Sequence, residues 1–392
     1  MRNLRRIGVG AGIGVLTLAL AAPGAAAHDT YGRATLTGFA ALPAATFVSA
    51  SDPSGSLLGG TPSNGITPPF ADQPIQGFSG IVRNGDGTFE VLSDNGYGNK
   101  ANSADFVLRI QRVAPDYGNH TVDVVGGINL TDPNSFVPFA LTRPDRVLTG
   151  SDFDVESIQR AKDGTYWIGD EFGPYLLHFD RAGRLLQAPI PLDGVRAPEN
   201  PAGNPNLNSS KGFEGLAQSP DGRKLYALLE GVVAGDAAGG LRLNEFDIAS
   251  KTYTGKRWIY QLEDPANAIG DAIAVDDDRF LIIERDNGQG ATAKFKRIYL
   301  AKKKNNGTLE KTLVADLMNI ADPRHLGSTD GTFTFPFQTI EDVVILDDRT
   351  LGVVNDNNFP FSSGRTPGQP DNNEFITIRL TDSLHADKRF LK

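Results

Sequence analysis

Carboxylates recur at regular places along this chain. Acidic residues open four short apolar segments, at Glu156, Glu214, Asp271 and Glu341, and Ser79 stands at the corresponding place in a fifth. Further polar or acidic residues follow 13 to 16 positions later in each segment. These closing positions are Asp94, Asp170 with Glu171, Glu230, Glu284 with Asp286, and Asp356 with Asn357. An oxygen-rich set of this kind suits Ca²⁺, which takes roughly six to eight oxygen ligands.

We predict two roles for these residues. The catalytic carboxylates are Glu156, Glu214 and Glu341. The metal ligands are Asp94, Asp170, Glu171, Glu230, Asp271, Glu284, Asp286, Asp356 and Asn357. Carboxylates held this close repel one another unless cations neutralise them, so we expect bound Ca²⁺ at the site. The alternative is structural, because Asp and Glu also cap strand ends and accept hydrogen bonds from turn amides.

Three basic residues stand close to the acidic positions in the sequence. Lys100, Lys211 and Arg285 are predicted to bind the anionic part of a substrate. Other chemistries have weaker support. The chain has no cysteine and no G-x-S-x-G elbow, and of its five histidines only His325 stands in a loop suited to chemistry. A metal-free esterase built on His325 with Ser79 or another serine is therefore a further hypothesis, after the metal-assisted hydrolase and a non-catalytic binding protein.

The acidic positions lie in five segments that share one plan, which indicates a repeat protein. Each segment is a short apolar stretch, an Asp-rich turn and a second apolar stretch. The turns Asp86-Gly87, Asp163-Gly164 and Asp221-Gly222 are typical of tight β-hairpins. Further alternating stretches follow each hairpin, as in LRLNEFDI from Leu241. Four strands per repeat predict the blade of a β-propeller; a β-sandwich would not require one motif to recur in the same order.

The two ends of the chain are predicted to close the ring. The last repeat supplies only three strands, the third being NEFITIRL from Asn373. The segment YGRATLTGFAAL from Tyr31 can supply the fourth, which would remove the open sheet edges. The fold class is therefore all-β, a propeller of five four-stranded blades, with six as the alternative because a degenerate blade could hide in the long inserts. In an antiparallel hairpin the opening and closing positions are neighbours, so the ring brings the carboxylates together near its axis.

The first 27 residues have the order of a secretory signal peptide. Arg2, Arg5 and Arg6 precede an apolar run, and Ala25-Ala26-Ala27 forms a small-residue cleavage site. Glycines and Pro23 interrupt the run, which disfavours a membrane anchor. We predict cleavage near Ala27 by the general or the twin-arginine route, a mature domain over 28–392, and a secreted or periplasmic protein. Removal of the three arginines changes the net charge from −9 to −12, which disfavours nucleic acid and membrane partners.

Several of these segments also resemble a known family. GFEGLAQSPDGRKLYALLEG, the pair DVES and WIGDEFGPY, and IEDVVILDDRTLGVVNDNNFPF are similar to the phytase-like family, described as "esterase-like activity of phytase". The resemblance covers about Tyr31 to Leu380. It implies a secreted or periplasmic propeller-like domain with phosphoesterase or esterase activity.

The function predicted from the sequence is a secreted, metal-assisted hydrolase of phosphate or carboxylic esters. Its substrate would be a small-molecule ester or phosphoester, its cofactor Ca²⁺, and its state a monomer. The alternative is a non-catalytic secreted propeller that binds a ligand, a polysaccharide or a protein.

Overall fold

The computed structural model describes Met1 and residues 33–391, and within them the regular structure is almost entirely β-strand. The predicted signal peptide and its cleavage site lie outside the described residues. Two short 3₁₀ turns, Ser56–Leu58 and Gly290–Thr292, are the helical elements of the described part. No helix there is long and apolar enough to cross a membrane.

Three four-stranded antiparallel meanders follow one another along the chain. The first consists of β6 (Val155–Arg160), β7 (Tyr166–Asp170), β8 (Tyr175–Phe179) and β9 (Ile190–Pro191). The second consists of β10 (Phe213–Gln218), β11 (Lys224–Leu229), β12 (Gly240–Asp247) and β13 (Thr252–Gln261). The third consists of β14 (Ala268–Ala274), β15 (Arg279–Arg285), β16 (Lys296–Lys303) and β17 (Leu309–Asp316).

Two more meanders share one larger sheet, in the order β2-β3-β4-β5-β1-β22-β21-β20. One contains β2 (Phe78–Arg83), β3 (Phe89–Ser93), β4 (Arg109–Asp116) and β5 (Thr121–Asn129). The other contains β20 (Asp342–Asp347), β21 (Thr350–Val354), β22 (Asn373–Arg379) and β1 (Thr35–Leu42). A single pair of residues, Ala41 and Thr121, joins the two meanders. The short strands β18 (Ile320–Ala321) and β19 (Thr332–Phe333) extend this sheet beside β1.

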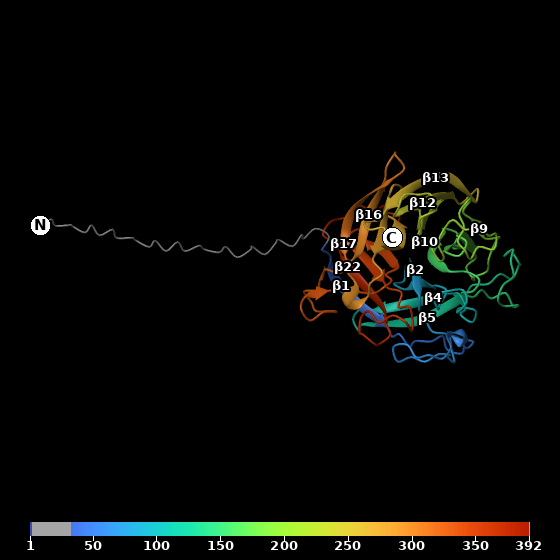
Figure 1. Cartoon of the computed structure of the whole chain (residues 1–392), viewed down its shortest axis with the longest axis horizontal. Coiled ribbons are helices and arrows are strands. Elements are labelled where there is room, and N and C mark those ends of the chain that lie inside the picture. Colours follow the sequence, from blue (N-terminus) through green and yellow to red (C-terminus); the bar gives the residue numbers. More distant parts are fainter. Residues whose placement is uncertain (2–32, 392) are drawn as a thin grey trace. The chain divides into compact units, whose positions relative to one another are not determined.

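The pairing of the two chain ends is confirmed. Strand β1 runs antiparallel to β22 from Thr35 opposite Arg379 to Leu42 opposite Asn373. The first strands of the meanders then contact one another in the order β2, β6, β10, β14, β20 and back to β2. Figure 1 shows this ring around a central axis. The all-β propeller class predicted from the repeats is therefore correct.

Burial explains why the repeats form a ring. Strands nearest the axis are buried on both faces, as in the BBBBBi pattern of β10, whereas the outermost strand β13 is mostly exposed. Apolar residues of neighbouring meanders form shared cores, such as Tyr226 with Phe280. Each meander therefore buries its faces against its neighbours, as repeat architectures do.

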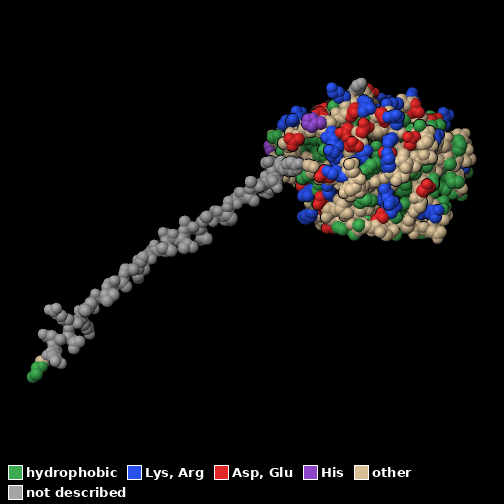
Figure 2. Space-filling view, turned by 90° about the horizontal axis from the view of Figure 1, so that it is seen from above, with side chains coloured by type: hydrophobic (Ala, Val, Ile, Leu, Met, Phe, Trp, Pro, Cys, Tyr) green, Lys and Arg blue, Asp and Glu red, His purple; other side chains and the backbone are tan. Residues whose placement is uncertain are grey.

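The inner strands run from one end of the ring to the other, and their two ends differ. The loop end, where these strands begin, carries the long segments 49–76, 94–108, 196–211 and 355–372. The turn end, where they finish, carries the tight Asp-Gly hairpins. At these hairpins Gly87 and Gly164 adopt positive φ, and Asp86 and Asp163 accept hydrogen bonds from the amides two residues later. Figure 2 shows charged side chains of both signs gathered toward one edge of the face it draws.

Candidate functional site

Ten corresponding backbone positions surround the axis at the loop end, two from each meander. The strand pairing aligns them, because Phe78 pairs with Ser93, Val155 with Asp170, Phe213 with Leu229 and Ile269 with Glu284. In each of these pairs, the residue that follows each of the two paired residues in the sequence faces the axis, and we call it a ring position. The opening positions are Ser79, Glu156, Glu214, Gly270 and Glu341, and the closing positions are Asp94, Glu171, Glu230, Arg285 and Asp356.

A β-bulge marks the opening position in four of the inner strands. The register shifts between Val155 and Ser157 and between Phe213 and Gly215, so Glu156 and Glu214 are the inserted residues. Equivalent shifts lie in β2 and β14. A bulge re-aims a side chain and commonly stands beside a functional site. Here the inserted glutamates join the buried carboxylates of the loop end.

One meander differs from the others, because it brings a cation instead of two carboxylates. Gly270 takes the opening position and Arg285 the closing one. A Cβ at Gly270 would lie 1.8 Å from the carbonyl oxygen of Ile340, so the neighbouring backbone leaves no room for a side chain. Arg285 has a side chain only 6% exposed, and its Nη2 lies 3.2 Å from Glu341, 3.7 Å from Glu230 and 3.9 Å from Glu214. Arg285 is thus the central counter-charge of the ring.

We call the carboxylates around the axis the acidic cluster. Its members are Asp94, Asp154, Glu156, Glu171, Glu214, Glu230, Glu341 and Asp356. Burial, followed by repulsion from neighbouring carboxylates, raises the pKa of Glu156, Glu171 and Glu214 well above the usual range. The pKa of Glu341 is raised to about 8 by burial and by Asp356, although Arg285 and the Ser79 hydroxyl oppose the shift. Raised pKa values mean that these groups together need protons or a cation.

Two triads of the acidic cluster have the geometry to bind a metal ion. Asp154, Glu156 and Glu171 offer oxygen atoms that all lie within 4.8 Å of one another, and so do Glu171, Glu214 and Glu230. Two of these oxygens, Oε1 of Glu171 and Oε1 of Glu214, are buried and have no hydrogen-bond partner among the described residues. An unpartnered buried carboxylate oxygen is unfavourable, so a ligand of positive charge would stabilise it.

The predicted basic residues occupy different places. Arg285 lies inside the acidic cluster. Lys211 stands at its edge, with 40% of its side chain exposed and an ion pair to Glu230. Lys100 is exposed in the loop after β3, where its ammonium group lies 5.6 Å from the centre of the Phe172 ring. The structure therefore brings two of the three basic residues to the carboxylates.

Nine of the fifteen residues predicted from the sequence meet at this site, and the register explains why the others do not. The nine are Asp94, Glu156, Glu171, Lys211, Glu214, Glu230, Arg285, Glu341 and Asp356. Asp170 lies one residue before its ring position. Its two oxygens accept hydrogen bonds from the amides of Asp154 and Gly173. It holds the turn after β7.

Asp271, Glu284 and Asp286 flank the ring positions of the third meander. Asp271 accepts a hydrogen bond from the Val343 amide and so joins β14 to β20. Glu284 binds the hydroxyl of Tyr260 and the ammonium of Lys311 on the side away from the axis. Asp286 forms an ion pair with the buried Lys296 at 2.9 Å.

Asn357 holds a loop at this end of the ring. Its side chain accepts from the Gly77 amide and donates to the Asp371 carbonyl oxygen. The hypothesis of a Ser79 and His325 pair finds no matching contact among the described residues. Ser79 donates to Glu341 at 2.8 Å, and the His325 ring contacts the carbonyl oxygen of Ser328 in its own loop.

Asp154 is the cluster member that the sequence reasoning missed. It accepts hydrogen bonds from Asn95 at 2.7 Å and Ser210 at 3.0 Å, and it belongs to the first metal triad. The signal was present, because Asp154 begins the motif DVES. The corresponding residues of the other repeats are not acidic, so a search for recurring positions passes over it.

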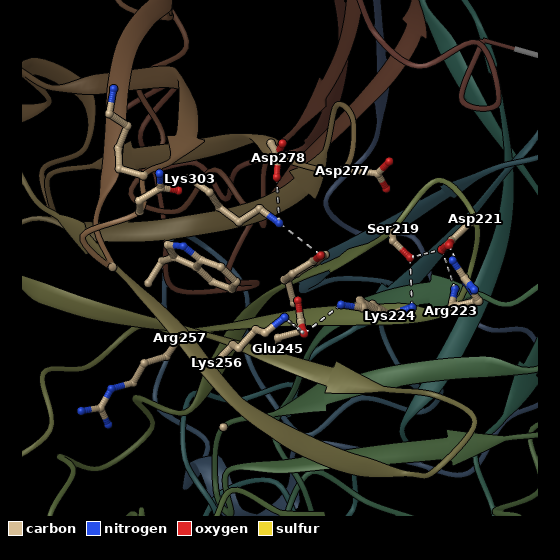
Figure 3. A pocket seen from close by; sticks show the side chains of 16 residues that line it. Ser219, Asp221, Arg223, Lys224, Glu245, Lys256, Arg257, Asp277, Asp278 and Lys303 are labelled. Carbon is tan, nitrogen blue, oxygen red and sulfur yellow. Dashed lines mark hydrogen bonds and ion pairs between the residues drawn. The ribbon is translucent and has the colours of Figure 1, made fainter.

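A large groove lies at the other end of the ring. It has a volume of about 840 Å³ and is formed by the turns of the second and third meanders. Figure 3 shows its acids bonded to its bases: Glu245 meets Lys224 at 2.9 Å and Lys303 meets Asp278 at 3.3 Å. Lys303 also lies over the rings of Tyr226 and Trp258. Its charges are largely satisfied internally, unlike those of the acidic cluster.

Known proteins share parts of the sequence and the fold. A protein of Arthroderma benhamiae named "Uncharacterized secreted protein" is 31% identical over 186 residues, which cover 36% of each chain. The chain thus spans about a third of the length of this curated relative. Among solved structures, a putative exo-β-1,3-galactanase from Bifidobacterium bifidum has 12% identity over 80% of this chain and 93% of its own, with a TM-score of 0.43. A luciferin-regenerating enzyme has 12% identity over 80% of both chains, with a TM-score of 0.39.

A family assignment follows from the sequence itself. The pattern of the phytase-like family, "Esterase-like activity of phytase", matches residues 73–359. This range contains every member of the acidic cluster together with Lys211 and Arg285. The resemblance of the repeat segments to this family is confirmed, and the chain belongs to the phytase-like family.

Proposed function

We propose that the acidic cluster is the active site of a secreted, cation-assisted hydrolase of phosphate or carboxylic esters. One observation carries the proposal: buried oxygens of Glu171 and Glu214 accept no hydrogen bond from the described residues, and both glutamates belong to carboxylate triads of metal-binding size. Membership of a family described by esterase-like activity supports the reaction class. Buried carboxylates with perturbed pKa values are also typical of functional sites.

The donor set favours a hard divalent cation, with Ca²⁺ as the first choice. Every candidate ligand is a carboxylate oxygen, since the chain has no cysteine and no histidine belongs to the triads. Asp154, Glu156 and Glu171 would hold one ion, and Glu171, Glu214 and Glu230 offer a second arrangement around the same shared residue. When bound, the ion would supply a positive centre that polarises an ester oxygen.

The chain's own groups would do the rest of the chemistry. Glu156, Glu214 or Glu341 would accept a proton from a water molecule, whose oxygen then bonds to the ester phosphorus or carbonyl carbon. The ester bond to the alcohol breaks, and the alcohol oxygen receives a proton as it leaves. Arg285 and Lys211 would orient an anionic substrate group, because both cations already face the cluster.

The test is hydrolysis of p-nitrophenyl phosphate, p-nitrophenyl acetate and phytate by the purified protein, with Ca²⁺ added or chelated. We expect cation-dependent turnover of at least one substrate. Glu214→Gln should lower turnover at least about 100-fold while the protein stays folded. Glu310→Gln is the matched control, because that exposed residue pairs with Lys304 away from the cluster.

A second function is distinguished by the same experiment. A non-catalytic propeller could use the triads as a structural cation site and bind a ligand, a polysaccharide or a protein at the loop end. It would be stabilised by Ca²⁺ but would turn over no substrate. Cleavage that persists in chelator and is blocked by a serine-directed phosphonate would instead revive the metal-free esterase.

We propose that the protein is exported with residues 1–27 as a signal peptide. The order of charge, apolar run and small residues supports this, as does the name of the fungal relative. Mass spectrometry of the protein from the extracellular or periplasmic fraction should show a mature chain beginning near His28. An intact N-terminus on exported protein would contradict the cleavage.

A further inference from the structure

A second cavity lies on the axis at the turn end of the ring, opposite the acidic cluster. Its volume is about 310 Å³. Residues at the ends of the inner strands β2, β6, β10 and β14 line it, together with β20 and the C-terminal segment. In Figure 1 the C-terminal end of the chain is drawn near the middle of the ring, which agrees with Arg389 and Phe390 being part of the lining.

One part of the wall of this axial cavity is apolar. Ile81, Ile273, Ala274, Val343 and Ile345 come from three different inner strands. Phe390 adds an aromatic wall from the tail and packs against the core shared by the second and third meanders. The cavity therefore combines an apolar part with polar side chains, and small-molecule sites use both kinds of group.

The charged groups of the axial cavity are all cationic donors, and its other polar side chains are amides. Arg83, Arg160 and Arg389 line it with Asn84, Gln159 and Gln218, and no acidic residue belongs to the described lining. Arg83 donates to the carbonyl oxygen of Leu346 and has no ion pair among the described residues. Nε2 of Gln218 is buried and lacks a partner within the same part of the chain. A donor of this kind needs an acceptor that the protein does not provide.

Two carboxylates near the axial cavity, Glu90 and Asp387, are already paired. Glu90 accepts from Arg160 at 3.2 Å and from the hydroxyl of Tyr166 at 3.0 Å. Asp387 pairs with Arg389 at 2.6 Å. Arg83 is thus the cation without a counter-charge, in a chain whose overall charge is strongly negative. A cavity that places an unpaired arginine beside an apolar part of its wall favours ligands with an anionic head and an apolar body.

We propose that the axial cavity binds a short amphiphilic anion, with its apolar chain between the inner strands and its carboxylate or phosphate head on Arg83. The volume lies at the small end of the range for ligand sites, which favours short chains. This site is separate in sequence position and in chemistry from the acidic cluster, so it goes beyond the proposed hydrolase.

The experiment is titration calorimetry of the full protein with octanoate, octyl phosphate and octanol, in chelator so that no turnover intervenes. We expect saturable binding of at least one anion. Octanol, which lacks the charge, should bind at least about tenfold more weakly. The better of the two anions identifies the head group that the site prefers.

Two variants make the proposal falsifiable. Arg83→Gln should weaken anion binding at least about tenfold, whereas Arg112→Gln, an exposed arginine of the same meander paired with Asp86, should leave it unchanged. Ala274→Leu should abolish binding by filling the cavity. If that variant does not fold, the comparison of Arg83→Gln with Arg112→Gln is sufficient to test the proposal. Absence of saturable binding to the wild-type protein, or equal affinity in Arg83→Gln, would overturn the proposal.

Discussion

The two ends of the inner strands differ in how their charges are balanced. At the loop end seven carboxylates at ring positions, together with Asp154, gather around Arg285 and Lys211, and several carboxylate pKa values are raised. At the turn end the axial cavity is lined by arginines and amides, and the nearby acids are paired. The same strands build both ends, so the difference arises from which residues begin and end each strand. The loop end is electrostatically incomplete without a ligand, whereas the turn end is nearly balanced.

The largest expected effect follows from removal of the central cation. Arg285→Met would leave buried carboxylates facing one another without their main counter-charge. Breaking a buried ion pair by removing one partner destabilises by about 3–5 kcal/mol, and we expect a loss of this size in urea unfolding with chelator present.

Arg83→Met is the matched change at the turn end. Arg83 is exposed and has no ion pair in the described structure, so its loss should change the free energy of unfolding by less than about 0.5 kcal/mol. Equal effects of the two substitutions would show that the ends do not differ in electrostatic balance.

A smaller loss is expected from crowding at the loop end. Gly270→Ala places a Cβ against the carbonyl oxygen of Ile340, so β14 and β20 must separate and Arg285 must shift. We expect a destabilisation of about 1–3 kcal/mol by thermal or urea unfolding. Gly85→Ala is the control, because a Cβ there meets no atom within 4 Å. It should be nearly neutral.

The pH dependence of stability tests the incomplete charge balance. Burial raises the pKa of Asp356 to about 6 and that of Glu341 to about 8, above the unfolded values of 3.8 and 4.5. The folded protein then binds more protons than the unfolded chain, so its stability falls as pH rises through this range. In chelator we expect the melting temperature to drop between pH 5 and pH 9. Glu341→Gln should reduce the drop, and Ca²⁺ should reduce it further. A flat profile in chelator would contradict the raised pKa values.

The smallest expected difference concerns two lysine pairs. Lys211 pairs with the buried Glu230 at the loop end, and Lys304 pairs with the exposed Glu310 at the turn end. Lys211 is itself partly exposed, so solvent screening limits its contribution. Lys211→Gln should destabilise by about 1 kcal/mol in chelator, and Lys304→Gln by less than about 0.5 kcal/mol. Unfolding curves measured side by side would detect this difference.

The fold was largely predictable because the same sequence motif recurs in each meander. The Asp-Gly turns, the alternating strands and the missing fourth strand near Asn373 each imply a local structure, and together they require a closed ring. The strand pairing of β1 with β22 confirms the closure. The lengths of the long loops follow from the sequence, but their paths do not, because side chains such as Asn64 fix them through contacts almost 300 residues away.

The sequence predicted that acidic residues gather near the axis, but it did not predict which residue of each strand faces the axis. Acidic character led to Asp271 as the opening position of its repeat, whereas strand pairing assigns that position to Gly270 and assigns Asp271 to an inter-strand hydrogen bond. Spacing does not reveal the error, because Asp271 and Asp286 are separated by 15 residues, as are Gly270 and Arg285. The acidic character of a segment cannot show the strand register. A shift of one residue moves a side chain to the opposite face of the strand without changing the composition.

The pairing of β1 with β22 has a consequence for folding. Among the described strands β1 is the first to be synthesised and β22 the last, and about 340 residues separate Leu36 from its partner Ile378. Closing so long a loop costs little more entropy than closing one half as long, but the contact cannot form until the chain is nearly complete. The ring therefore stays open during synthesis. In a chain that stops before Asn373, β21 and β1 each keep an unpaired edge. Such edges pair with other chains and so promote aggregation, and the open segment is accessible to proteases.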